Sequence, residues 1–163
     1  DITADVVEDG TTFEENAIKK ATEIMKISGK LTLADDSGLE IDYLDKAPGV
    51  YSSRFMGEDT PYLEKNTAIL QKLEGVPEEK RTARFVSCIA AAFPDGRVRT
   101  CRDTIEGIIG YEIKGSNGFG YDSIFFVPEI GKYLAEISRE EKNAISHRGK
   151  ALRKMKEILK NEL

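Results

Sequence analysis

The sequence predicts an α/β fold in a single domain, with a mixed, twisted sheet covered by helices. Segments 13–28 and 147–162 have the apolar spacing of amphipathic helices. The region between them contains several short apolar runs, and a Pro-Asp-Gly turn at 94–96 separates two of these runs in the pattern of a β-hairpin. Because helices and strands do not alternate strictly, a mixed sheet flanked by helices fits this order best.

The first helix is expected over residues 13–28. Thr12 and Glu15 have the spacing of a capping box, which satisfies free amides in the first turn of a helix. Asn16 and Lys20, at positions i and i+4, lie on one rim of the apolar stripe. The stripe itself recurs at helical spacing: Phe13, Ala17, Ala21, Ile24 and Ser28.

Two short strands and a second helix are expected next. The runs LTLAD and LEIDYL predict strands on either side of an Asp-Asp-Ser-Gly turn. Residues 59–74 predict a helix with Pro61 in its first turn, since the fixed φ of proline suits that position. Gly29 and Gly75 are expected to end the first and second helices.

The second half of the sequence predicts the hairpin, one more strand and the last helix. The hairpin strands are expected at 81–93 and 97–109, and the run DSIFFV predicts a further strand. Ser138 and Glu141 repeat the capping-box spacing. The final segment, 147–162, has an apolar helical face formed by Leu152, Met155, Ile158 and Leu159.

Composition limits the class of protein. At 163 residues with 40% hydrophobic content, the chain has enough apolar material for one core. It has no apolar run near the roughly 18 residues that span a bilayer and no signal-peptide pattern, so we expect a cytoplasmic protein without a membrane partner. A formal net charge of -5, with both signs interspersed, argues against a nucleic-acid partner. Cys88 and Cys101 are too few for a disulfide scaffold, and we expect two buried, reduced thiols with no bond between them.

The motif LADDSGLEID, residues 33–42, places two aspartates side by side. A strand alternates its side chains, so Asp35 and Asp36 are expected to point to opposite faces, and only one of them can enter a given site. A carboxylate followed by a small polar residue and a glycine suits Mg²⁺, which uses only one or two protein carboxylates. The alternative is that one of the aspartates only caps a turn through its side chain.

The stretch GSNGFGYDS, residues 115–123, combines three glycines with two aromatic residues. The glycines allow backbone amides to approach a ligand closely, and Phe119 can hold its ring against a flat partner such as a nucleobase. The stretch matches neither the Walker nor the Rossmann glycine pattern. The alternative is a glycine-rich turn in which Phe119 and Tyr121 are ordinary core aromatics.

The stretch EEKNAISHRGKAL, residues 140–152, carries Lys142 and a basic cluster at the start of the last helix. A helix N-terminus exposes free amides and a partial positive charge, so with Ser146 as its cap it suits an anion or a base carbonyl. His147 is the only histidine of the chain. A lone histidine is more often structural or exposed than catalytic, and basic residues at helix ends are usually solvated.

Five motifs in one order carry a family resemblance. TFEENAIKKA, ADDSGLEID, APGVYSSRF, GFGYDSIFF and SREEKNAISHRGKAL closely resemble the inosine triphosphate pyrophosphatase family, from about residue 8 to the C-terminus. The family removes noncanonical purine nucleotides such as dITP, ITP and XTP. The resemblance implies an elongated, two-lobed α/β fold with its active site between the lobes, and a homodimer. It also implies Mg²⁺-dependent hydrolysis of a nucleoside triphosphate to a monophosphate and pyrophosphate.

The resemblance implies roles at the aspartate motif and the first helix. Asp36 matches the general base and metal-associated carboxylate, with Ser37 beside the substrate. Glu15 matches an acidic residue linked to metal binding, although its capping-box position explains it equally well without a metal. Three residues are expected to support this group: Asp35, Asn16 and Lys20.

The resemblance also implies where the base and sugar bind. Donors from the His147 and Arg148 region would satisfy a 6-oxo group but would face an amino group in adenine. Buried polar groups left unpaired cost about 1–3 kcal/mol each, which discriminates hypoxanthine from adenine by one or two orders of magnitude. The residues matched to substrate binding are Phe119, Gly120, Tyr121, Asp122, Lys142, His147 and Arg148.

One departure from the family pattern concerns the start of the sequence. Family members begin with a strand and a Thr/Ser-Gly-Asn-x-x-Lys phosphate loop, and we expect both to be absent from this chain. Two other functions remain open: a nucleotide-binding module without turnover, and a Maf-like pyrophosphatase that acts on other modified nucleotides. The SHRGKAL ending argues against the second.

Overall fold

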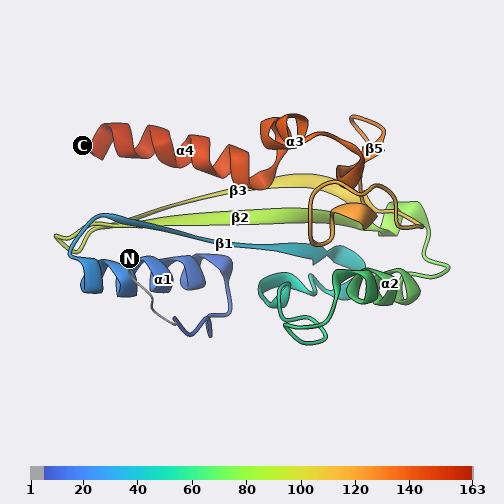
Figure 1. Cartoon of the computed structure of the whole chain (residues 1–163), viewed down its shortest axis with the longest axis horizontal. Coiled ribbons are helices and arrows are strands. Elements are labelled where there is room, and N and C mark those ends of the chain that lie inside the picture. The colour runs from blue at the N-terminus through green and yellow to red at the C-terminus, as the bar shows by residue number, and fades with distance from the viewer. Residues whose placement is uncertain (1–5, 163) are drawn as a thin grey trace. The chain divides into compact units, whose positions relative to one another are not determined.

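The structure is a computed structural model and describes residues 6–162. Within that range the helices and strands form an α/β fold, which confirms the predicted class (Figure 1). The strands lie in one sheet with the order β1-β2-β3-β4-β5. The helices are α1 (Phe13–Ser28), α2 (Tyr62–Lys72), α3 (Arg139–Ile145) and α4 (His147–Glu162), and the strands are β1 (Thr32–Ile41), β2 (Thr82–Ala92), β3 (Val98–Ile109), β4 (Phe125–Val127) and β5 (Lys132–Tyr133).

The chain divides into two compact units, which we call the terminal unit and the central unit. The terminal unit contains the described residues up to Ser37, Val86–Thr104 and the described residues from His147 onward. The central unit contains Gly38–Phe85 and Ile105–Ser146. Strands β1, β2 and β3 contribute residues to both units, so each unit has a part of the sheet as its base.

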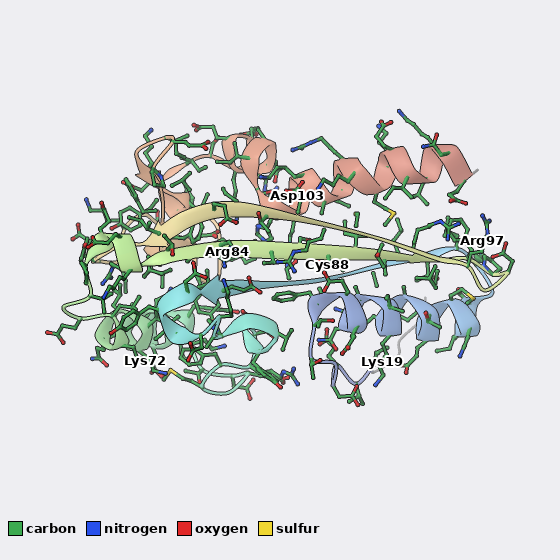
Figure 2. All side chains as sticks on the ribbon, turned by 180° about the vertical axis from the view of Figure 1, so that it is seen from behind. Lys19, Lys72, Arg84, Cys88, Arg97 and Asp103 are labelled. Carbon is green, nitrogen blue, oxygen red and sulfur yellow. The ribbon has the colours of Figure 1, made fainter. Side chains whose placement is uncertain are left out.

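The terminal unit packs a helix on each face of its strands, α1 on one side and α4 on the other (Figure 1). Strand alternation divides the residues of β2 between the two helices. Ile89 and Ala91 pack in one cluster with Ala151 and Met155 of α4. Cys88, which Figure 2 labels on β2, lies on the other side, close to Glu14 of α1, which helps to raise the pKa of its thiol.

Both ends of α1 follow the predicted local signals. The Thr12 side chain accepts a hydrogen bond from the Glu15 amide at 3.1 Å. Gly29 ends the helix at a φ of 70°, a left-handed conformation that glycine adopts without strain, and its amide donates to the Met25 carbonyl. The Glu15 carboxylate does not complete the capping box, because it accepts instead from the amide of Thr11 at 2.7 Å.

The central unit builds its core between the sheet and α2. Ile69 and Leu73 of α2 are buried in one cluster with Leu39 and Ile41 of β1. Beside them lies Arg81, a guanidinium only 2% exposed. It donates to four carbonyl oxygens: those of Leu73 and Val76 after α2, and those of Ile109 and Gly110 at the end of β3.

The aspartate motif differs from the prediction. The expected strand, turn and second strand are one continuous strand, β1, and Asp35 and Asp36 lie in its middle. Gly38 does not adopt a positive φ, so the chain does not turn there. Sheet formation beside β2 explains the difference, because it keeps Ser37 and Gly38 extended where the local sequence favours a turn.

Smaller differences affect two other elements. Helix α2 begins at Tyr62, because Pro61 is its N-cap with an extended ψ of 145° and therefore lies outside the first turn. The predicted strand DSIFFV is shortened to β4, since residues Asp122–Ile124 form a 3-10 turn before it. The hairpin is confirmed, with Gly96 at a φ of 96° in its turn.

The two cysteines are free, as expected. Cys88 is buried as expected, but the expectation of burial is wrong for Cys101, which is partly exposed because it lies beside α4, where its thiol donates to the Ala151 carbonyl. Cys88 faces α1 and Cys101 faces α4, so the two thiols point away from each other. Among the helices in residues 6–162, none combines the length and the apolar character needed to cross a bilayer.

Candidate functional site

The terminal unit brings three predicted residues together at Asp36. The Asp36 carboxylate points from β1 toward α1, where Asn16 Nδ2 donates to Oδ2 at 3.3 Å and Lys20 Nζ lies 3.5 Å from Oδ1. Asn16 and Lys20 are one helical turn apart, which is why both reach the same carboxylate. The predicted rim of α1 therefore forms one cluster with the second aspartate of the motif.

The charge of this cluster is incompletely balanced. The Asp36 side chain is 13% exposed, and its burial raises the pKa of the carboxyl above the usual range, although Lys20 and Asn16 act in the opposite direction. Lys20 divides its charge, because its ammonium also pairs with Glu8 at 2.7 Å and donates to the Asp35 carbonyl. A further cation beside Asp36 would stabilise the ionised carboxylate.

The donor chemistry at Asp36 fits Mg²⁺, which takes one or two protein carboxylates and completes its shell with water and phosphate oxygens. No group of three or more His, Cys, Asp or Glu side chains within residues 6–162 is placed to hold a metal ion. A site based on Asp36 does not require such a group. Glu15 is the second predicted ligand. Its Oε2 accepts hydrogen bonds from the Thr11 amide at 2.7 Å and from the Thr11 hydroxyl at 3.2 Å.

The opposite face of β1 carries a second polar group. Asp35 points toward α4, where Arg148 Nε lies 3.8 Å from its carboxylate. Ser37 links the two, since its hydroxyl lies 3.4 Å from Asp35 Oδ2 and 3.5 Å from Arg148 Nε. The expectation that Asp35 and Asp36 face opposite sides is confirmed. His147, the first residue of α4, is buried in the same unit.

A pocket of about 360 Å³ opens on this second face. Its polar side is formed by Asp35, Ser87 and Arg148. Its apolar side is formed by Leu33, Ala34, Ile89 and Leu152. A carboxylate, a hydroxyl and a guanidinium beside an apolar wall suit a polar ligand that has one flat or apolar side.

The central unit holds the glycine-rich loop through Asp122. One oxygen of this buried carboxylate accepts from the Phe119 amide at 3.0 Å and from Lys142 Nζ at 2.5 Å. Lys142 also lies 4.3 Å above the centre of the Phe119 ring. Gly118 has a φ of 74°, and a Cβ there would collide with the Asp122 carboxylate. Glycine is therefore required for this close approach.

The two aromatic residues of the loop have different environments. Phe119 is 64% exposed, so its ring is available to a flat partner. Tyr121 is 4% exposed, and its hydroxyl donates to the Ser52 carbonyl at 2.5 Å. Its ring meets the edge of Tyr62 at 5.1 Å, and burial raises the pKa of the phenol. The core-aromatic alternative therefore describes Tyr121 but not Phe119.

A pocket of about 260 Å³ lies beside the loop. The loop residues Gly115–Gly120 form one wall, and Tyr62, Leu63 and Asn66 of α2 form another. Exposed glycine backbone, an exposed aromatic ring and a carboxylate together suit a planar ring that has polar edges. The predicted residues thus fall into three groups: two on opposite faces of β1 in the terminal unit and one at the loop of the central unit.

Two residues of α2 support the loop and were not predicted from the sequence. Asn66 Nδ2 donates to the Gly120 carbonyl and to the Ser123 hydroxyl, both at 3.2 Å. Lys65 is buried, donates to the Ser53 carbonyl at 2.9 Å and lies 4.5 Å from the centre of the Tyr62 ring. One signal was available in the sequence, since Asn66 shares a helical face with Ile69 and Leu73 and is therefore a polar residue on an apolar stripe.

The fold of this chain is that of solved Ham1 proteins. The structure superposes on that of the Staphylococcus aureus Ham1 protein with a TM-score of 0.93 and 41% identity, covering 98% of this chain and 82% of that one. It superposes on a HAM1 protein from Coxiella burnetii with a TM-score of 0.91 and 43% identity, covering 97% and 81% of the two chains. Both likenesses extend over nearly the whole of the present chain.

The chain belongs to the Ham1 family, whose sequence model matches residues 1–158. A relative from Desulforamulus reducens, named dITP/XTP pyrophosphatase, is 55% identical over 155 residues, which is 95% of this chain and 77% of the relative. A relative of the same name from Exiguobacterium sibiricum is 50% identical over 159 residues, 98% and 80% of the two chains. The family resemblance inferred from the five sequence motifs is therefore confirmed.

Proposed function

We propose that the protein hydrolyses noncanonical purine nucleoside triphosphates, namely dITP, ITP and XTP, to the monophosphate and pyrophosphate, and so removes them from the nucleotide pool. The observation that carries this proposal is the near-full-length similarity to relatives named dITP/XTP pyrophosphatase. The Asp36 cluster has chemistry that suits a triphosphate, and the Phe119 loop has chemistry that suits a purine.

The hydrolysis of the triphosphate is assigned to residues of the terminal unit. Asp36 would orient the attacking water and accept its proton, a role that suits a carboxyl whose pKa is raised by burial. Lys20 and Asn16 hold this carboxylate in place. Mg²⁺ is the proposed cofactor, held by Asp36 with Glu15 as a second ligand, and it would supply charge neutralisation and acidification of water.

The base and sugar are assigned to the loop and to the start of α4. Phe119 would stack on the purine, with Lys142 and Asp122 fixing the ring and the backbone at Gly120. Tyr121 contributes through its buried contacts, which hold the loop in place. His147 and Arg148 are proposed as donors to the 6-oxo group. Ser37 lies beside the substrate, and Asp35 orients Arg148 through their ion pair.

The family resemblance also supports proposals about the assembly, the compartment and the partners of the protein. We propose a homodimer that acts in the cytoplasm on a free nucleotide, without a nucleic-acid or membrane partner. Size-exclusion chromatography with light scattering would test the assembly. A dimer mass supports the proposal, and a monomer mass at micromolar concentration contradicts it.

The products of hydrolysis test the function directly. The protein is incubated with Mg²⁺ and dITP, ITP, XTP, ATP or GTP, and pyrophosphate and orthophosphate are measured separately. We expect pyrophosphate from dITP, ITP and XTP, with ATP slower by one to two orders of magnitude, and loss of activity when EDTA removes the metal. Orthophosphate release, equal rates with ATP, or tight binding of dITP without any product would contradict the proposal, and the last result would favour a binding module.

A further inference from the structure

We infer that Asn66 is a positioning residue, which fixes the backbone of the glycine-rich loop so that Phe119 and Asp122 are already arranged for the nucleotide. The inference rests on the proposed function only for the identity of the nucleotide. The arrangement of the loop itself is a property of the central unit, and the structure shows the contacts that maintain it.

The contacts of Asn66 span the middle of the loop. Its Nδ2 donates to the Gly120 carbonyl and to the Ser123 hydroxyl, so one amide group holds both sides of Tyr121 and Asp122. A carbonyl oxygen can only accept, which fixes the amide orientation with Nδ2 toward Gly120. Asn66 itself is anchored in the second turn of α2 and is 2% exposed.

The other half of the same amide argues against a purely structural role. Asn66 Oδ1 is buried and has no hydrogen-bond partner among the described residues. A buried acceptor without a partner lowers stability, and an apolar residue of similar size would avoid that loss. Asparagine is therefore a poor choice for packing alone, and its two donated bonds are the feature that distinguishes it from leucine at this position.

The loop depends on the hydrogen bonds from Asn66 because its glycines allow many backbone conformations. Gly118 and Gly120 have φ values of 74° and 63°, and glycine has more conformations available than any other residue. The Phe119 ring is 64% exposed, so burial contributes little to holding it. Fixing the backbone before the ligand arrives reduces the ordering cost of binding, which should appear in KM more than in kcat.

Asn66→Leu is the test, because leucine keeps the volume and removes both donors. We expect the KM for dITP to rise about ten-fold with kcat within about two-fold of wild type. Hydrogen exchange of the amides at 118–123 should become faster in the absence of any nucleotide, while Tm changes by no more than a few degrees. Thr67→Val is the matched control, a polar-to-apolar change at the next position of α2, where the side chain is exposed and donates to the Leu63 carbonyl.

Ser123→Ala provides a second variant in case Asn66→Leu does not fold. It removes one of the two acceptors and should raise KM and loop exchange by a smaller factor, about three-fold. Wild-type KM and wild-type loop exchange in both variants would overturn the inference, as would an equal change in Thr67→Val. If the wild-type protein releases no pyrophosphate from dITP, the proposed function fails, and the exchange measurement still decides the role of Asn66.

Discussion

Neighbouring residues of this protein can make different contacts, because the backbone directs their side chains to opposite faces of a strand. Asp36 faces α1 and meets Asn16 and Lys20, whereas Asp35 faces α4 and meets Arg148. Strand periodicity predicted that separation from the sequence alone. The glycine-rich loop has no such period, so its sequence does not predict which of Phe119 and Tyr121 is exposed. The structure shows that Phe119 is exposed and Tyr121 is buried.

Arg81 is the residue whose replacement should most affect the central unit. Its guanidinium satisfies carbonyl oxygens after α2 and at the end of β3 from a fully buried position. In Arg81→Lys, a single ammonium cannot reach all four acceptors, and each buried carbonyl left unpaired costs about 1–3 kcal/mol. We expect the free energy of unfolding in urea to fall by roughly 2–4 kcal/mol.

The control for that experiment is Arg99→Lys, at a half-exposed arginine that pairs with Glu162 at 2.8 Å. An exposed ion pair contributes about 0–1 kcal/mol, so this variant should stay close to wild type. Equal stabilities for the two variants would mean that the buried hydrogen bonds of Arg81 contribute little.

Among the helices and strands, the predictions from local sequence signals were confirmed where the signal acts within the element itself. Thr12 and Gly29 mark the ends of α1, and the Pro-Asp-Gly turn marks the hairpin, because caps and turns act within a few residues. The turn expected at Ser37 and Gly38 was wrong because pairing in the sheet is not local. Asn66 was missed for the same reason, since its partner Gly120 lies 54 residues away.

The cap of α1 gives a prediction at this scale. Thr12→Ala removes the acceptor of the Glu15 amide and should lower the free energy of unfolding by about 0.5–2 kcal/mol. Thr12→Ser keeps a hydroxyl at the same position and should retain most of the stability. Chemical denaturation of both variants checks this, and a serine variant as unstable as the alanine variant would contradict the role of the hydroxyl.

A network on the sheet of the central unit makes stability depend on pH. Arg84, on β2 (Figure 2), donates to Asp42 at 3.0 and 2.9 Å, and these bonds hold the pKa of the Asp42 carboxyl well below its usual range. A carboxyl with a lowered pKa contributes stability above the pKa of the unfolded chain, about 3.9. That contribution is lost as the pH falls toward the folded-state pKa.

Urea unfolding between pH 7 and pH 2 tests this linkage. We expect the stability of wild type to fall more steeply below about pH 4 than that of Asp42→Asn, so that the two curves converge in acid. Glu79→Gln, at an exposed position of the 78–80 turn, serves as the control and should follow the wild-type curve. Parallel curves for wild type and Asp42→Asn would show that the Arg84 network does not contribute.

For the whole molecule, the sequence predicted the α/β class and the family, but it did not predict how the candidate site residues are grouped in space. The order of five motifs identified relatives whose similarity covers nearly the entire chain. The structure adds that the predicted residues form three groups. Asp36 and Arg148 belong to opposite faces of β1 in the terminal unit, and Phe119 and Lys142 lie in the central unit. Such grouping depends on long-range packing, which motif order does not contain.

Asp36 is proposed to activate the water that splits the triphosphate, and Asp36→Asn tests this role most directly. Asparagine keeps the shape of the side chain and removes its charge and basicity. The initial rate of pyrophosphate release from dITP should fall at least about 100-fold with Tm little changed, while Asp59→Asn, at an exposed aspartate, keeps the wild-type rate. A folded Asp36→Asn variant that releases pyrophosphate at the wild-type rate would contradict the account.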